Sequence, residues 1–268
     1  MTLHLTRAVL LATAGLALAA ASGPASAAAP APTPTAADWA ALARLPDWTV
    51  GVWQIDWASL FGRGATGRPD PPALTPEYAA KLAAFQAGQK NGENVQNANA
   101  NCLPPGVPQI MSMPYPLEFI YSPGRVTIAI ETDSQVRRIY TDGRPHQDDP
   151  DPAFNGDSIG HWEGADLVVD TIALDPSVDI APGVNHSDKV HVVERFHQTG
   201  PDTLQIATTI EDPAVLTKSW TVTRPYLRHR DWTIQEYVCE QNNHDSADDK
   251  GRAGFRLGDD APAAAPAH

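Results

Sequence analysis

The feature that most constrains this chain is a series of short β-rich segments between residues 114 and 240, separated by Gly, Pro, Asn or Asp. Turns this short join antiparallel neighbours, because a parallel pair needs a crossover of a dozen residues or more. We predict strands at 48–57, 116–121, 125–132, 135–141, 158–163, 167–172, 189–197, 203–210, 218–224 and 231–240. About ten such strands form either a closed barrel or a strongly bent sandwich.

Of these two architectures we expect the barrel, mainly β and antiparallel, with the β-sandwich as the alternative. Gly51-Val52-Trp53 resembles the motif at the first strand of lipocalins, which favours a calycin-like barrel. One or two helices precede most of the strands. Residues 35–45 have apolar side chains at helical spacing, and Thr75 followed by Pro76 marks the start of a second helix. We expect this second helix to cover the core.

The first residues have the order of a secretory signal peptide. Arg7 precedes an apolar run at 8–20, and Ala25-Ser26-Ala27 is a typical cleavage site. We therefore divide the chain into a signal peptide at 1–27, a flexible leader at 28–36, a single domain at 37–245 and a disordered tail at 246–268. Nowhere later do eighteen apolar residues follow one another, so we predict a periplasmic or secreted protein without a membrane span.

Charge and cysteine content narrow the class further. A formal net charge of -13 argues against a nucleic-acid partner, which would need a concentrated basic surface. In an oxidising compartment Cys102 and Cys239 are most simply a disulfide, stabilising by roughly 3 to 5 kcal/mol through the unfolded chain. Motifs for nucleotide phosphates, nicotinamide, covalent haem and the serine nucleophile elbow are missing. We therefore expect no organic cofactor.

The stretch "DSIGHWEGADLVVDT" at 157–171 predicts a hairpin with its turn at Gly164-Ala165-Asp166. Side chains alternate along a strand, so His161 and Glu163 share a face with Ile159, while Trp162 points the other way. If that shared face is the barrel interior, the imidazole and the carboxylate form a candidate acid–base pair.

Two further acids share a face with apolar residues. Glu194 lies between Val192 and Phe196, and Glu236 lies between Ile234 and Val238. A buried charge is costly unless it is paired, so each acid needs an arginine partner, a place at the barrel mouth or a substrate to act on. Arg138 is a candidate partner.

These residues lead to two functional hypotheses. The first is an exported lyase, hydratase or isomerase acting on a hydrophobic or aromatic substrate, with the candidate catalytic residues His161, Glu163, Glu194, Arg138 and Tyr140. The alternative is a periplasmic binding protein for a hydrophobic small molecule. Either would use a pocket, for which the candidate binding residues are Trp53, Trp232, Glu236, Phe196 and His146.

A metal site is the weaker possibility. His186 and Asp188 share a strand face and, with His191, have the donor types that suit zinc or a similar ion. No H-x-H or H-E-x-x-H spacing supports this, so our first expectation is a protein without a bound metal.

Four blocks of sequence carry a resemblance to known proteins: residues 102–119, "VRRIYTDGRPH" at 136–146, "GDSIGHWEGADLVVDT" at 156–171 and "HSDKVHVVERF" at 186–196. Together they resemble a family of exported, mostly uncharacterised bacterial proteins, over roughly residues 100–240. The resemblance implies export and a β-rich domain, and it implies no reaction.

Overall fold

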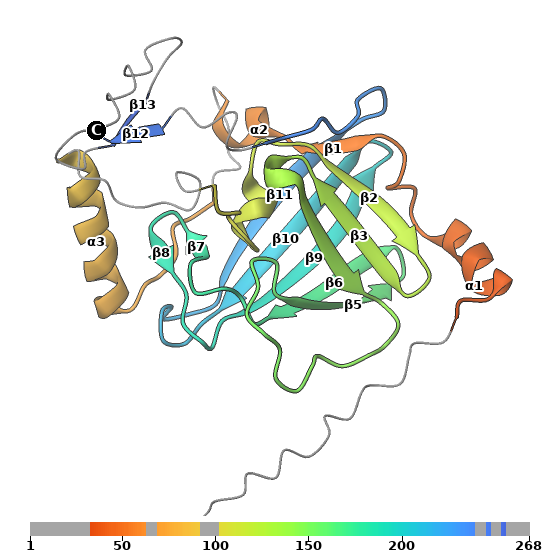
Figure 1. The fold of residues 1–268 in the computed structure, drawn as a ribbon, viewed down its shortest axis with the longest axis horizontal. Coiled ribbons are helices and arrows are strands. Elements are labelled where there is room, and N and C mark those ends of the chain that lie inside the picture. The colour runs from red at the N-terminus through yellow and green to blue at the C-terminus, as the bar shows by residue number, and fades with distance from the viewer. Residues whose placement is uncertain (1–32, 63–68, 92–101, 239–244, 248–252, 256–268) are drawn as a thin grey trace, which may run out of the picture. The chain divides into compact units, whose positions relative to one another are not determined.

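A computed structural model describes residues 33–62, 69–91, 102–238, 245–247 and 253–255 (Figure 1). The predicted signal peptide, most of the predicted leader and most of the predicted tail lie outside these residues. So does Cys239, and the disulfide with Cys102 therefore stays a prediction. Within the described residues no helix is long and apolar enough to cross a membrane.

The predicted barrel is confirmed. Strands pair around a closed ring in the order β1-β11-β10-β9-β6-β5-β4-β3-β2, which excludes the two-sheet sandwich (Figure 1). The strands of the ring are β1 (Val52–Ile55), β2 (Leu117–Ser122), β3 (Arg125–Ile130), β4 (Gln135–Tyr140), β5 (Asp157–Glu163), β6 (Asp166–Ile172), β9 (His191–Gly200), β10 (Thr203–Glu211) and β11 (Trp220–His229). The predicted hairpin at 157–171 is β5 and β6.

One pair in the ring is parallel, and the strand count explains why. The described ring has nine strands, and strands that alternate in direction around a closed ring must be even in number. The exception is the β4–β5 pair, joined through Tyr140 and Ile159 alone. Residues 141–156 make the connection that a parallel pair requires.

Three α-helices and three 3-10 turns are described outside the ring. The helices are α1 (Ala36–Ala41), α2 (Trp57–Phe61) and α3 (Pro76–Lys90), with 3-10 turns η1 (Leu42–Arg44), η3 (Gln109–Ser112) and η4 (Thr132–Ser134). Both predicted helix starts are confirmed: Thr35 and Asp38 form a capping box, and Pro76 is the first residue of α3. Two small sheets lie outside the ring, from β7 (Asp179–Ala181) with β8 (Val184–Asn185) and from β12 (Asp245–Ala247) with β13 (Ala253–Phe255).

The predicted strand at 231–240 is not formed within the described residues 231–238. The reason is closure of the ring. β11 already pairs with β10 on one side and with β1 on the other, so it has no free edge for another strand.

Large side chains fill the barrel interior. Trp48, Trp53, Phe119 and Phe196 are fully buried and their rings contact one another, with centroids 5.3 to 6.5 Å apart. These rings pack closely in the interior, and the pockets of the described residues lie at an end of the barrel or on its outer wall.

Candidate functional site

A pocket of about 200 Å³ lies at one end of the barrel. Thr208 and Ile210 come from the last part of β10, and Val222 and Arg224 come from the first part of β11. Residues from α2, η3 and the β7–β8 segment complete the wall. We call this the mouth pocket, and its lining residues are Trp57, Phe61, Pro108, Gln109, Ser112, Ile180, Pro182, Thr208, Ile210, Trp220, Val222 and Arg224.

Helix α2 supplies the aromatic side of the mouth pocket. Asp56 caps the helix by accepting a hydrogen bond from the Ser59 amide at 3.2 Å. The cap starts a single helical turn, which places Trp57 and Phe61 four residues apart on the same face. Their rings stack with centroids 4.9 Å apart, and Phe61 is 55% exposed. A flat apolar surface therefore borders the opening of the pocket.

Arg224 supplies the charge of the mouth pocket. Its Nε donates to Ser112 Oγ at 3.2 Å, which fixes the plane of the guanidinium. Nη1 is buried without a hydrogen-bond partner, and in the described part of the chain no carboxylate lies within 4.0 Å to form an ion pair. Burial lowers the pKa of Arg224 from its ordinary value. The Nε1 of Trp57 is also buried and unpartnered among the described residues.

Segment η3 is tied across the barrel end by a buried tyrosine. Tyr226, on the inward face of β11, donates its hydroxyl hydrogen to the carbonyl oxygen of Met111. Burial raises the pKa of Tyr226, so the phenol stays neutral. Ile110 and Met111 are themselves buried, and together these contacts position Ser112 beside Arg224.

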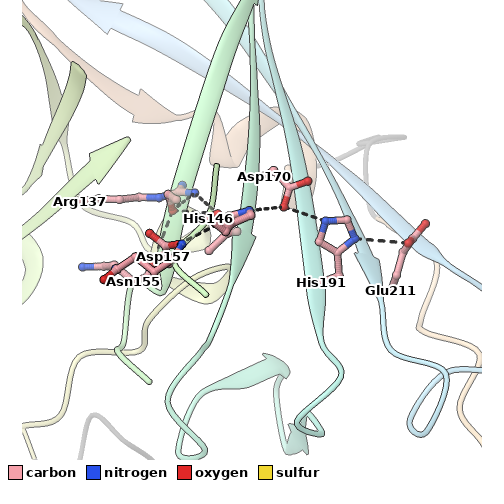
Figure 2. Close-up of polar contacts among 10 residues, drawn as sticks. Arg137, His146, Asn155, Asp157, Asp170, His191 and Glu211 are labelled. Carbon is pink, nitrogen blue, oxygen red and sulfur yellow. Dashed lines mark hydrogen bonds and ion pairs between the residues drawn. The ribbon is translucent and has the colours of Figure 1, made fainter. Parts of the chain in front are cut away.

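The barrel interior also contains a buried ion pair, whose arginine, Arg137, is labelled in Figure 2. Arg137 on β4 and Glu194 on β9 are both fully buried and bonded through Nη2 and Oε2. The same Nη2 lies 3.1 Å from Thr171 Oγ1 and 3.5 Å from Ser158 Oγ. Of the three roles considered for Glu194, pairing with an arginine is the one observed, and the partner is Arg137 rather than Arg138.

Arg138 was the wrong partner because of strand parity. Arg137 and Ile139 point inward, whereas Val136 and Arg138 point outward and Val136 is 41% exposed. The apolar residue at 136 suggests the opposite face, so the sequence pattern on β4 misleads.

A chain of imidazoles and carboxylates runs along the outer wall (Figure 2). His146 lies between Asp157 and Asp170, with nitrogen–oxygen distances of 2.9 and 3.0 Å. His191 lies between the same Asp170 oxygen, at 2.8 Å, and Glu211, at 3.5 Å. This His–Asp chain attaches the connection at 141–156 to β5, β6, β9 and β10.

The carboxylates of the His–Asp chain affect the protonation of His191. Burial lowers the pKa of the ring, but hydrogen bonds and charge from Asp170 and then Glu211 outweigh burial, so the pKa lies above its ordinary value. The protonated ring therefore binds both carboxylates.

His161 and Glu163 do not face the interior, so the prediction of an enclosed acid–base pair is wrong. Their side chains are 65% and 49% exposed, and they bond each other at 3.0 Å on the outer wall. Glu163 also accepts from Arg195 at 2.6 Å, and this bond, with that from His161, lowers the pKa of the carboxyl. The inward residues of β5 are Ser158, Gly160 and Trp162, and Trp162 packs on Trp48 with centroids 5.4 Å apart.

The remaining candidate catalytic residues lie elsewhere on the outer wall. Arg138 and Tyr140 line a mostly polar pocket of about 390 Å³ beside the β4–β5 pair, and Asp157, the partner of His146, lines it too. The structure therefore brings Arg138 and Tyr140 together, with His146 beside them, but not with His161 or Glu194.

None of the predicted binding residues lines the mouth pocket. Trp53 and Phe196 are fully buried, and the guanidinium of Arg228 lies 4.4 Å above the Trp53 ring. Trp232 is 43% exposed and stacks on His229 at 3.7 Å. Glu236 is exposed outside any described strand, so its expected inward direction is wrong.

The residues of the weaker metal alternative share a groove of about 570 Å³: His186, Asp188 and His191 all line it. Both nitrogens of His186 face backbone carbonyl oxygens, of Ser187 at 2.7 Å and of Asp175 at 2.9 Å. Neither nitrogen is therefore directed at a shared ion. The described residues contain no group of three or more His, Cys, Asp or Glu side chains arranged to bind a metal.

The sequence contained a signal for Arg224 that our prediction missed. Trp220, Val222, Arg224 and Tyr226 alternate along one strand, and an arginine among apolar residues on the inward face resembles the pattern that identified Glu194. Trp57 gave no such signal, because it lies just after the first strand in a turn of helix.

Comparison with known proteins adds little. No protein-family model and no curated protein matches the sequence. Among solved structures, the chain is similar to a secretary abundant heat soluble (SAHS) protein from Ramazzottius varieornatus, with 11% identity and a TM-score of 0.32, over 69% of this chain and 100% of that one.

Proposed function

We propose that this protein binds a small, largely apolar molecule in the mouth pocket. The observation that carries the proposal is an aromatic pocket at the end of a closed barrel whose interior is packed with large aromatic side chains. Concave sites lined by aromatic side chains with a few fixed polar groups are typical of small-molecule binding, and barrel mouths are a common place for them. With the predicted signal peptide, we also propose that binding takes place outside the cytoplasm.

The size of the pocket limits the ligand. Pockets for drug-sized molecules measure roughly 300 to 1,000 Å³, so a volume of about 200 Å³ suits a smaller molecule or one end of a longer one. One aromatic ring stacked near Trp57 and Phe61, with a short substituent, is the expected scale.

Binding of aromatic fragments tests this proposal. Benzyl alcohol, benzamide and benzoate are titrated into the full mature chain and followed by saturation-transfer NMR. We expect at least one of them to bind, and F61A to weaken that binding at least fivefold. W39A is the matched control, since Trp39 is also 55% exposed but lies on α1, outside the pocket. The proposal fails if no fragment binds, or if F61A and W39A behave alike.

A further inference from the structure

We propose that the ligand of the mouth pocket carries a carboxylate, which the guanidinium of Arg224 binds. This inference rests on the proposed function and names the chemical class of the ligand. It begins from an imbalance of charge: Arg224 lines the pocket, and no acid among the described residues pairs with it.

The other arginines that point into the barrel have their charges balanced. Arg137 is paired with Glu194. Arg228, whose side chain is fully buried, lies 3.1 Å from Asp47 and 3.6 Å from Asp202. Arg224 is thus the inward-facing arginine whose counter-charge the described residues do not supply. A partly buried cation without a partner is costly in a folded protein unless a ligand completes it.

Asp212, the other buried acid among the described residues, does not supply that counter-charge. Its two oxygens accept hydrogen bonds from the Ser187 amide and hydroxyl, both at 2.7 Å, and from the Ala214 amide at 3.2 Å. The bonds from Ser187 join the segment before β9 to the segment after β10. Asp212 is also not part of the pocket lining. The mouth pocket therefore keeps a local positive charge in a chain whose formal net charge is -13.

The geometry of the free donors selects the ligand group. Ser112 engages Nε, Nη1 is buried without a partner among the described residues, and no described residue hydrogen-bonds Nη2. Two parallel N–H donors in a fixed plane match the two oxygens of a carboxylate, and this bidentate pair is stronger than a bond to a neutral carbonyl. The Nε1–H of Trp57, on the same wall, is also buried without a partner among the described residues.

Pocket size and lining define the rest of the ligand. A volume of about 200 Å³ limits the ligand to a small molecule. Trp57, Phe61, Trp220, Ile210 and Val222 offer apolar surface around that space. An aromatic or short branched carboxylic acid fits both the volume and the lining.

Affinities for benzoate and benzamide test the inference, because the two molecules have nearly the same shape and differ in charge. The wild-type chain is titrated with each by NMR at fixed ionic strength. We expect benzoate to bind at least tenfold more tightly than benzamide. R224M should remove that preference while leaving benzamide within about twofold. R224K should keep part of it, since lysine retains the charge but not the planar pair of donors.

R144M is the matched control, because Arg144 is exposed, pairs with Asp142 and does not line the pocket. R144M should keep the wild-type preference. Equal binding of benzoate and benzamide by the wild type, or a preference that survives in R224M, overturns the inference and leaves the proposed function intact. Absence of binding by all aromatic fragments overturns both. If R224M does not fold, a preference that is reduced in both R224K and S112A supports the inference, and a preference that is unchanged in both overturns it.

Discussion

Replacing Glu194 by glutamine tests the account of the barrel interior. Glutamine has nearly the same shape, so the change removes a charge and leaves little cavity. Arg137 Nη2 would keep its hydrogen bonds to the hydroxyls of Thr171, at 3.1 Å, and Ser158, at 3.5 Å. Its Nε and Nη1 already lack partners among the described residues. The arginine would then be a fully buried cation with no counter-charge.

Removing one partner of a buried ion pair costs about 3 to 5 kcal/mol. For a domain of this size each kcal/mol lowers the Tm by about 2 to 4 °C, so E194Q should melt roughly 6 to 20 °C below the wild type. The free energy of unfolding is measured by urea titration with tryptophan fluorescence, and thermal melts provide an independent value.

The double variant R137M/E194M separates the value of the pair from the cost of breaking it. Replacing a buried pair by apolar side chains of similar volume is often neutral or stabilising, so the double variant should be clearly more stable than E194Q. A cost below about 1 kcal/mol for E194Q would refute the reasoning. The reasoning would also be refuted if the loss of unfolding free energy in R137M/E194M equalled the sum of the losses in R137M and E194M, because the effects of uncoupled residues are additive.

The remaining predictions concern the backbone and the outer wall. G51A should cost at least about 1 kcal/mol more than G143A in urea unfolding: both glycines have a positive φ, but a Cβ at Gly51 would lie 2.5 Å from the His229 carbonyl oxygen and one at Gly143 meets nothing within 4 Å. The pKa of His191 is raised in the folded state, so the protonated ring stabilises the fold below about pH 6.5, and this stabilisation is lost as pH rises through the folded pKa. H191Q should therefore lower the free energy of unfolding more at pH 6 than at pH 8.5. An equal effect at both pH values would contradict this account. H161A should leave the Tm within about 2 °C, since the ring is 65% exposed, and a larger fall would place it in the core.

Local structure could be read from the sequence because its signals act over a few residues. The hairpin of β5 and β6 follows from alternation and the turn at Gly164, where φ is +65°. The start of α3 follows from Thr75 and Pro76, since proline fits the first helical position. The barrel, which is antiparallel except for the β4–β5 pair, follows from strand count and short turns.

The face that each strand turns inward could not be read in the same way. Closure of an odd-numbered ring puts β4 and β5 side by side in parallel, and no pattern within either strand signals this. On β5 the inward face carries Ser158 and Gly160, whereas the outward face carries Ile159. At these positions the usual pattern of apolar side chains inside and polar side chains outside is reversed. Ser158 faces inward because its hydroxyl bonds Thr171 at 2.8 Å, beside the Arg137 charge.

The lyase or isomerase hypothesis depended on that face. It required His161 and Glu163 in an enclosed space, and both lie on the exposed outer wall. The mouth pocket depends on different residues, from β10, β11, α2 and η3, which are distant in the sequence and meet only because the ring closes.

The indole N–H signals of the tryptophans test the central claim most directly. Trp57 Nε1 has no partner in the described structure, whereas the Nε1 atoms of Trp48 and Trp53 already donate to Gln198 at 3.0 Å and to the Trp48 carbonyl at 2.9 Å. In a ¹⁵N-resolved titration with benzoate, we predict that the Trp57 signal, assigned with W57F, moves downfield and saturates while those of Trp48 and Trp53 stay in place. A saturating titration that shifts Trp48 or Trp53 and leaves Trp57 unchanged would contradict binding at the barrel mouth.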